Sequence, residues 1–302
     1  MTCSACGADR LAPLRPRRTA DGSFSLWSEG VQEGFHCAAG AMAEAQATFI
    51  RPAGLERLAC GTGLRVVEVA VGTGTNTAAL IEVASDQALA LEWWGLELDP
   101  RPLDLALADA RFRGQWRPGT TAALEQVMAT GLLLGDARRR LRDLAPLAGR
   151  VDLVLLDAFS PRRCPQLWSV EFLTGLAHLL APQGRLLTYS AAAAVRRGLQ
   201  LAGLQIASIR PSAAIALPSG GPARWSGGTA ASPTPLPPDG PLAPLSPQEQ
   251  DHLTTAAAEP YRDPSGEADA ATIEEARRRA QAASGAASTS AWRRRWRLDH
   301  GG

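Results

Sequence analysis

The chain has 302 residues, and its 31 basic and 30 acidic side chains give a formal net charge of +1. This balance excludes a nucleic-acid binder that works through bulk positive charge, although it leaves room for a local basic patch. Every basic side chain other than histidine is an arginine, which excludes chemistry that needs a lysine, such as a Schiff base or a phosphate-loop lysine.

Short apolar strands alternate with helical patterns between residues 19 and 211. In chain order we expect strands at 65–71, 91–98, 132–134, 151–156, 185–189 and 204–209, and helices at 75–83, 101–110, 169–180 and 190–201. Ser169 is a suitable N-cap for the third of these helices. The alternation predicts an α/β fold with a mostly parallel, doubly wound sheet, and in such sheets ligands bind beyond the carboxyl ends of the strands.

The composition changes at both ends of this region. Residues 1–18 are small, polar and rich in proline and arginine, so we expect them to be disordered. From about residue 211 the chain fills with Pro, Gly, Ser and Ala, which disfavours a helix or a central strand. We therefore expect the folded domain to span 19–232, and residues 233–302 to form a Pro-rich linker and an Arg-rich, helical or disordered tail.

The loop after the first strand is rich in glycine and reads Glu68-Val-Ala-Val-Gly72-Thr-Gly74-Thr-Asn76. Glycines let a backbone approach a ligand closely and leave amide groups free to face it. The spacing is not that of the dinucleotide fingerprint, which needs a third glycine three residues after the second. Alone, this loop is weak evidence for a particular nucleotide.

Acidic residues end the strands that follow. Glu97 and Asp99 stand where a carboxylate can accept both hydroxyl hydrogens of a ribose, and Asp136, before Ala137, stands where one can accept from the adenine amine. A single acidic residue at a strand end is more often a helix cap or a solvated loop residue. Asp157 is the fourth acidic residue at such a position, however, and four together are much harder to explain in that way. With no phosphate-binding cation nearby, the pattern predicts an adenosine without phosphates, of which S-adenosylmethionine is the commonest cofactor.

The loop after the fourth strand reads Asp157-Ala-Phe-Ser-Pro-Arg-Arg-Cys-Pro-Gln-Leu-Trp168. Pro161 predicts a rigid turn that presents a carboxylate and a ring together. An amine attacks a methyl group only as the neutral base, and Asp157 can orient it and accept its proton. Phe159 and Trp168 would border the sulfonium and exclude water. The alternative is that both rings belong to the core and that the proline only makes a turn.

Together these motifs resemble the methyltransferase half of the bifunctional tRNA-modification enzyme MnmC and its stand-alone relatives. The resemblance covers 19–211 strongly and 212–280 patchily, and the Asp157 loop is its specific element. The stretches that carry it are Asp21–Ser23, Glu33–His36, Gly40 to Glu44, Glu68 to Asn76, Gly135–Ala137, Asp157–Trp168, Gly184 to Arg196, and in the tail Pro260–Pro264 and Arg277–Arg279.

The resemblance implies a class I S-adenosylmethionine methyltransferase fold. It implies transfer of the methyl group of S-adenosylmethionine to the aminomethyl group of a modified wobble uridine of tRNA, giving 5-methylaminomethyluridine. Gly72, Gly74, Glu97, Asp136 and Ala137 would then hold the cofactor, and Asp157 would face the substrate amine. The family's flavin oxidase half is not in the sequence, so the implied partners are tRNA and another enzyme complex that supplies the aminomethyl intermediate.

Two residues depart from the family's usual pattern. Ala70 stands where the first glycine of the loop is usual, which makes the loop slightly fuller. Cys164 replaces a usual asparagine before Pro165, which removes an amide able to contact the substrate.

Other functions remain as alternatives. An aminopropyltransferase resembling spermidine synthase would use the same sheet, but such enzymes usually carry an extra aspartate in the glycine loop, which this sequence lacks. A non-catalytic RNA-binding module predicts loss of the cofactor acids, whereas Glu97, Asp136 and Asp157 are present. A dinucleotide-dependent dehydrogenase is disfavoured by the glycine spacing.

The remaining features are less specific. Cys3 and Cys6 form a single CxxC pair, which is half a zinc site, so we expect no metal. No run approaches ~18 apolar residues and no apolar signal core begins the chain, so we expect no membrane segment and a cytoplasmic protein. His36 either lines the substrate side or is structural. The arginines and tryptophans of 292–297 either contact RNA phosphates and bases or are solvated.

Overall fold

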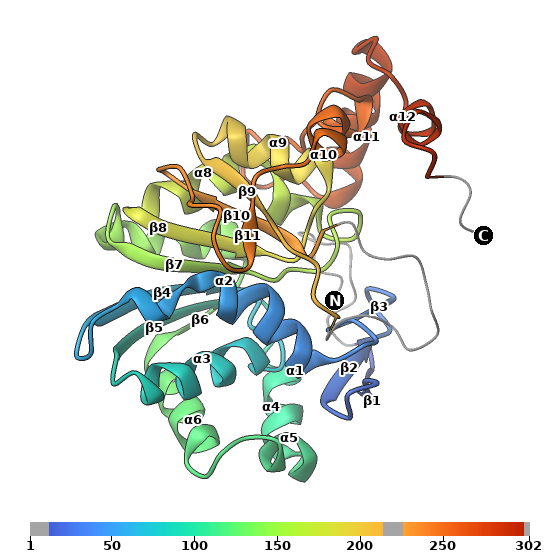
Figure 1. The fold of residues 1–302 in the computed structure, drawn as a ribbon. Coiled ribbons are helices and arrows are strands. Elements are labelled where there is room, and N and C mark those ends of the chain that lie inside the picture. Colours follow the sequence, from blue (N-terminus) through green and yellow to red (C-terminus); the bar gives the residue numbers. More distant parts are fainter. Residues whose placement is uncertain (1–11, 214–225, 299–302) are drawn as a thin grey trace.

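The computed structural model describes residues 12–213 and 226–298, and an eight-stranded sheet divides this part of the chain into two helical layers (Figure 1). The order across the sheet is β11-β9-β10-β8-β7-β4-β5-β6. A separate small sheet, β1-β2-β3, lies beside α1 and α4. The strands are β1 (Leu14–Arg18), β2 (Phe24–Ser28), β3 (Glu33–Gly34), β4 (Gly63–Val69), β5 (Ala90–Glu97), β6 (Leu132–Leu134), β7 (Val151–Leu156), β8 (Leu180–Thr188), β9 (Gln205–Ile209), β10 (Gly228–Ser232) and β11 (Leu242–Ala243).

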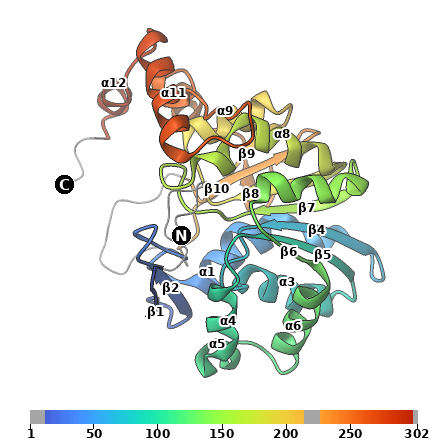
Figure 2. The same cartoon turned by 180° about the vertical axis from the view of Figure 1, so that it is seen from behind.

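Helices α3, α4 and α6 lie on one side of the large sheet, and α8, α9 and α11 lie on the other (Figures 1 and 2). The helical elements are α1 (Ala41–Glu44), η1 (Ala45–Ile50), α2 (Arg51–Ala53), η2 (Leu55–Arg57), α3 (Thr75–Asp86), α4 (Arg101–Ala108), α5 (Ala110–Gly114), α6 (Thr120–Gly131), α7 (Ala137–Arg140), η3 (Leu141–Leu147), η4 (Pro165–Trp168), α8 (Val170–Leu179), α9 (Ala193–Leu201), α10 (Pro247–His252), η6 (Ala256–Ala258), α11 (Ala270–Ala283) and α12 (Thr289–Arg295).

Strand β4 shows how the sheet separates two apolar cores. Leu64 and Val66 pack into the core that contains α3 and α6, whereas Val67 and Val69 pack into the core that contains α8 and α9. Successive side chains of a strand point to opposite faces, so a strand covered on both faces is mostly apolar, and in β4 the one fully buried charged residue is Glu68. Five of the predicted strands pair in parallel as expected, whereas the sixth, at β9, pairs antiparallel with β10 and β11. The predicted Ser169 N-cap of α8, whose hydroxyl accepts from Phe172 N, is confirmed.

The order of the central strands determines where a ligand can enter. The chain passes from β4 to β5 and β6 on one side, then returns to β7, which pairs in parallel with the other side of β4. The loops that leave β4 and β7 therefore diverge from neighbouring strand ends, and a crevice forms between them. The glycine loop and the Asp157 loop are these two loops.

The expectation that no central strand forms after residue 211 is wrong. Strand β10 runs antiparallel between β8 and β9, and all five of its residues are buried. Its sequence, Gly-Thr-Ala-Ala-Ser, contains no proline, and its small side chains fit between the helical layers. Gly228 has φ +143°, and a Cβ there would collide with the backbone oxygen of Thr188, so this position requires glycine.

The expected disorder of residues 1–18 is also corrected where the structure describes them, whereas the helices α11 and α12 agree with the helical alternative for the tail. Residues 14–18 pair with β2 as an edge strand, while 1–11 and the Cys3–Cys6 pair lie outside the described residues. The folded unit does not end at residue 232, because β11 extends the large sheet by pairing with β9, and α10 to α12 follow it. No helix in the described ranges has the length and apolarity needed to cross a bilayer.

A buried ion pair joins this added C-terminal part to the sheet. Arg196 of α9 donates to Glu249 of α10 at 2.8 Å, and both side chains are at most 4% exposed. Burial alone would raise the pKa of Glu249, but hydrogen bonds from Ser208 and the backbone of Ser246, with the charge of Arg196, outweigh it and lower this pKa. The ionised carboxylate of Glu249 therefore stabilises the fold at neutral pH, and this contribution is lost as the pH falls through the lowered pKa. Burial acts the other way on Arg196, whose pKa is also lowered, so the guanidinium depends on this counter-ion.

Replacing Glu249 by alanine would leave the Arg196 guanidinium buried without its counter-ion. We expect the free energy of unfolding, measured by urea denaturation, to fall by about 3–5 kcal/mol. The control is Glu267→Ala, which removes the exposed partner of Arg139 and should change this free energy by no more than about 1 kcal/mol. Equal small losses in both variants would contradict a structural role for the buried pair.

Candidate active site

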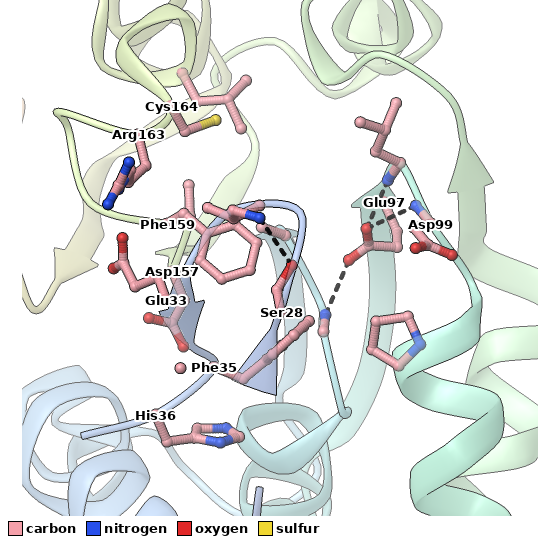
Figure 3. Close-up of a pocket in the computed structure, with 18 of the residues that line it drawn as sticks. Ser28, Glu33, Phe35, His36, Glu97, Asp99, Asp157, Phe159, Arg163 and Cys164 are labelled. Carbon is pink, nitrogen blue, oxygen red and sulfur yellow. Dashed lines mark hydrogen bonds between the residues drawn. The ribbon is translucent and has the colours of Figure 1, made fainter. Parts of the chain in front are cut away.

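A cavity of about 370 Å³ lies at the carboxyl ends of β4, β5, β6 and β7, and the small β1-β2-β3 sheet contributes its outer wall. This volume falls in the range of small-molecule sites. Glu97 and Asp99 lie on one side of the cavity, and Asp157 and Phe159 lie on the other (Figure 3). Of the residues predicted from the sequence, the cavity is lined by Gly72, Glu97, Asp99, Asp136, Ala137, Asp157 and Phe159.

The glycine loop forms the floor of the cavity. Gly72 has φ +58°, and a Cβ at this position would lie 3.1 Å from the ring of Phe35. Ala70, the first departure from the family pattern, has φ +61° and lines the cavity. A left-handed backbone at a residue with a Cβ costs about 1–2 kcal/mol, so this position would be less strained as glycine.

Glu97 is held in place by the backbone around it. Its carboxylate accepts hydrogen bonds from the amides of Gly72 (2.9 Å), Leu98 (2.6 Å) and Asp99 (2.9 Å). Burial raises its pKa, and these three bonds act against that rise. Asp99, by contrast, is engaged by Arg101, whose guanidinium donates to both carboxylate oxygens. Glu97 retains about one of its four acceptor positions, whereas those of Asp99 are taken up by Arg101, so Glu97 is the better placed of the two to accept a ribose hydroxyl.

Asp136 is the N-cap of α7. One of its oxygens accepts from Arg138 N at 3.0 Å, and both are bonded to the Arg138 guanidinium, at 3.2 Å and 2.8 Å. The carboxylate keeps part of its surface in the cavity. A carboxylate has about four acceptor positions, so Asp136 retains the capacity to accept one further hydrogen bond there.

Asp157 joins the two loops that form the crevice. Asn76 Nδ2 of the glycine loop donates to Asp157 Oδ2 at 2.7 Å. Burial raises the pKa of Asp157 well above its ordinary value, the charge of Glu44 adds to this rise, and the bond from Asn76 opposes it. A carboxylate with a raised pKa is a stronger base, which suits a group that takes a proton from an amine.

The ring of Phe159 faces the cavity, but Trp168 and Pro161 do not. Trp168 is fully buried, donates to the backbone oxygen of Phe159 at 2.9 Å and meets the ring of Tyr189 edge-on. Pro161 is also buried. Neither residue is among those that line the cavity. They support the loop from behind instead of contacting the reacting groups as predicted, because the loop turns the tryptophan into the core that contains α8 and α9.

Three predicted residues of the glycine loop also lie outside the cavity lining. Glu68 is buried beneath the loop, where Thr77 and Trp93 donate to its Oε2. Burial raises the pKa of Glu68 to about 7. Gly74 packs against leucines of α4 and α6, and Asn76 acts through its bond to Asp157. These residues shape the loop rather than present groups to a ligand.

The structure also adds residues to which the sequence assigned no definite role. Glu33 accepts from Ser160 N and Oγ at 3.0 and 2.7 Å, and Phe35 meets Phe159 edge-on. These contacts fasten the small sheet to the Asp157 loop. Glu44 and Tyr189 complete this side of the cavity. Glu33, Phe35 and Glu44 come from the part of the chain before the glycine loop, and only the family resemblance pointed to these residues.

His36 lines the cavity and is hydrogen-bonded to Ser25 Oγ through Nδ1 at 2.9 Å. Burial lowers its pKa to about 4, so it is neutral at physiological pH. Cys164 also lines the cavity, at the position where an asparagine is usual in the family. The described residues contain no group of three or more His, Cys, Asp or Glu side chains arranged to hold a metal.

Comparison with known proteins supports the geometry. Residues 110–214 match a family described as S-adenosyl-L-methionine-dependent methyltransferase. A relative in Azoarcus sp. (strain BH72), the "tRNA 5-methylaminomethyl-2-thiouridine biosynthesis bifunctional protein MnmC", is 32% identical over 57% of this chain and 30% of its own length. The protein of that name in Pseudomonas aeruginosa (strain UCBPP-PA14) is 35% identical over 47% of this chain and 24% of its length. The chain thus spans less than a third of these relatives.

The crystal structure of MNMC2 from Aquifex aeolicus superposes with a TM-score of 0.71 at 24% identity, covering 88% of this chain and 84% of that one. The superposition confirms the predicted class I methyltransferase fold. The cavity suits S-adenosylmethionine, because it offers fixed carboxylates that can accept from a ribose and from an adenine amine, without a phosphate-binding cation on the glycine loop.

Replacing Gly72 by alanine should weaken cofactor binding. The added Cβ approaches Phe35 and makes the left-handed backbone unfavourable, so the loop must shift. We expect the Kd for S-adenosylmethionine, measured by calorimetry, to rise about tenfold or more. Gly61→Ala is the control, because Gly61 has φ +80° and open space around it but lies outside the cavity lining. A similar rise in that variant would contradict a local effect.

Proposed function

We propose that this chain, an MnmC-like methyltransferase domain, moves the methyl group of S-adenosylmethionine to the aminomethyl group of a modified wobble uridine in tRNA. The observation that carries the proposal is the position of Asp157. Its carboxylate closes one end of a cavity whose other end holds the ribose and adenine acceptors Glu97 and Asp136. The names of the relatives, which specify methylaminomethyl-thiouridine biosynthesis, support this substrate.

The cofactor supplies a methyl group bound to a positively charged sulfur, and the protein prepares the amine. An aminomethyl group is protonated in neutral solution and must lose a proton before its nitrogen has a lone pair for attack. Asp157 accepts that proton, and its raised pKa brings its basicity closer to that of the amine. Asn76 holds the carboxylate in one orientation through its 2.7 Å bond.

Aromatic and backbone contacts keep this end of the cavity in shape. Phe35 and Phe159 meet at 5.1 Å between ring centroids, and Tyr189 donates from its hydroxyl to the backbone oxygen of Ala158 at 2.9 Å. The two rings exclude water from the methyl group, and the Tyr189 bond fixes the residue next to Asp157. Most of the rate enhancement would then come from alignment of nitrogen, methyl carbon and sulfur.

The partners follow from the same chemistry. We propose that tRNA is the macromolecular substrate and that an enzyme complex elsewhere supplies the aminomethyl intermediate. Since bacterial tRNA modification takes place in the cytoplasm, we expect the chain to act there.

Asp157→Asn should abolish methyl transfer while cofactor binding persists. The amide cannot accept the proton, so we expect at least about a 100-fold loss of turnover. The assay incubates purified protein with S-adenosylmethionine and tRNA that carries 5-aminomethyluridine, and detects 5-methylaminomethyluridine by nucleoside mass spectrometry. Calorimetry with S-adenosylmethionine should give a Kd close to that of the unaltered protein.

Asp152→Asn is the matched control, because Asp152 lies near the start of β7, at the end of the strand away from Asp157, where it accepts from Arg65 N. This variant should methylate normally. Full turnover in Asp157→Asn would refute the role of Asp157. Aminopropyl transfer from decarboxylated S-adenosylmethionine, or no product with the unaltered protein, would refute the proposed reaction.

Activity should fall as the pH falls through the raised pKa of Asp157, because the protonated carboxyl cannot act as a base. Two substitutions should shift the pH at which kcat falls on the acidic side, in opposite directions. Glu44→Gln removes a charge that raises the pKa of Asp157, so this fall should move to lower pH. Asn76→Ala removes a hydrogen bond that lowers the pKa of Asp157, so the fall should move to higher pH. The measurement is kcat against pH, and parallel shifts in both variants would contradict Asp157 as the titrating group.

A further inference from the structure

The buried guanidinium of Arg138 connects the adenine end of the cavity to the last quarter of the chain. Its Nη2 donates to Asp136 Oδ2 at 2.8 Å, and its Nη1 donates to Asp263 Oδ2 at 2.7 Å. The side chain of Arg138 is 5% exposed, that of Asp263 is 1% exposed and that of Asp136 is 16% exposed. This is a desolvated bridge rather than a surface ion pair, so its geometry is fixed.

Both the carboxylate and the backbone amide of Asp263 take part in further hydrogen bonds. Its Oδ1 accepts from Ser265 Oγ at 2.9 Å and from Ala268 N at 3.1 Å, and its own backbone amide donates to Glu171 at the start of α8 at 2.7 Å. Two residues earlier, Tyr261 accepts through its backbone oxygen from Val170 N. The segment 261–263 is therefore fastened both to the helix that follows the Asp157 loop and to the residue that supports Asp136.

The charges of the bridge favour an acceptor that faces the cavity. Two carboxylates share one guanidinium, so the group keeps a net charge of −1. Removal of the Asp263 charge would leave Arg138 to neutralise Asp136 alone, and would free the guanidinium to move. Both the fuller neutralisation of Asp136 and the movement of the guanidinium would weaken Asp136 as an acceptor for an N–H group in the cavity.

We propose that Asp263 is a positioning residue for the cofactor: through Arg138 it sets the place and the residual charge of the Asp136 carboxylate that accepts the adenine amine. The proposal rests on the assignment of Asp136 to the adenine, and it gives the C-terminal part of the chain a role in cofactor selection. It does not depend on which molecule receives the methyl group.

The test compares two ligands on the same protein by calorimetry. S-adenosylhomocysteine carries the adenine amine, whereas S-inosylhomocysteine has an oxygen acceptor in its place. The unaltered protein should prefer the first by about tenfold or more, because the second sets an acceptor against a carboxylate. Asp263→Asn should reduce this preference at least about threefold, in the same direction as Asp136→Asn. The ratio of the two Kd values is insensitive to the fraction of folded protein, so a simple loss of stability does not imitate the result.

Glu267→Gln is the matched control, since it removes one negative charge from the same loop at an exposed pair with Arg139. Its preference should equal that of the unaltered protein. If Asp263→Asn does not fold, Ser265→Ala loosens the same carboxylate more gently and should reduce the preference in the same direction.

An unchanged preference in Asp263→Asn, with both ligands weakened equally, would overturn the proposal in favour of a purely structural role. An unchanged preference in Asp136→Asn would refute the adenine assignment and the proposal with it. Both outcomes are separate from the tRNA assay, which reports on the acceptor end of the cavity.

Discussion

The parallel pairing of β4 with β7 is the constraint on which the site depends. It brings together two loops that are far apart in the sequence, so that Asn76 and Asp157, 81 residues apart, are within hydrogen-bond distance. The carboxyl ends of β5 and β6 complete the same edge and add Glu97 and Asp136. Because β4 and β7 are mostly apolar and are covered on both faces, their register is fixed, and this register sets the positions of the two loops.

The outer wall of the cavity, formed by the small β1-β2-β3 sheet, is held in place in a different way from the strands of the large sheet. It is a small antiparallel sheet from the beginning of the described chain, and side-chain contacts rather than shared strand pairing hold it over the site. Glu33 reaches Ser160, and Phe35 reaches both Phe159 and the glycine loop at Gly72. In the proposed reaction, this sheet would shield the transferred methyl group from bulk water.

Much of this architecture could be predicted from the sequence, because strand ends in a parallel sheet share one edge. That rule places Gly72, Glu97, Asp136 and Asp157 around one cavity, as the structure has them. It does not give the direction in which a loop turns its side chains, so it could not show that Trp168 and Pro161 lie behind the loop and outside the cavity lining. It is also silent on long-range pairing. The short run Gly228–Ser232 lies among prolines and has no strand signal of its own, yet β8 and β9 leave a gap that only small residues fill. The contribution of Glu33 likewise depends on a contact 127 residues away.

The bridge from Arg138 to Asp263 spans 125 residues of sequence. A ribosome adds ~5–20 residues per second, so Arg138 is synthesised on the order of ten seconds before its second partner. The central strands and the glycine loop are then already available to fold. A chain emerging from the ribosome thus acquires its scaffold first and its finished adenine pocket last, so that truncated products would have the sheet without the Asp263 contact.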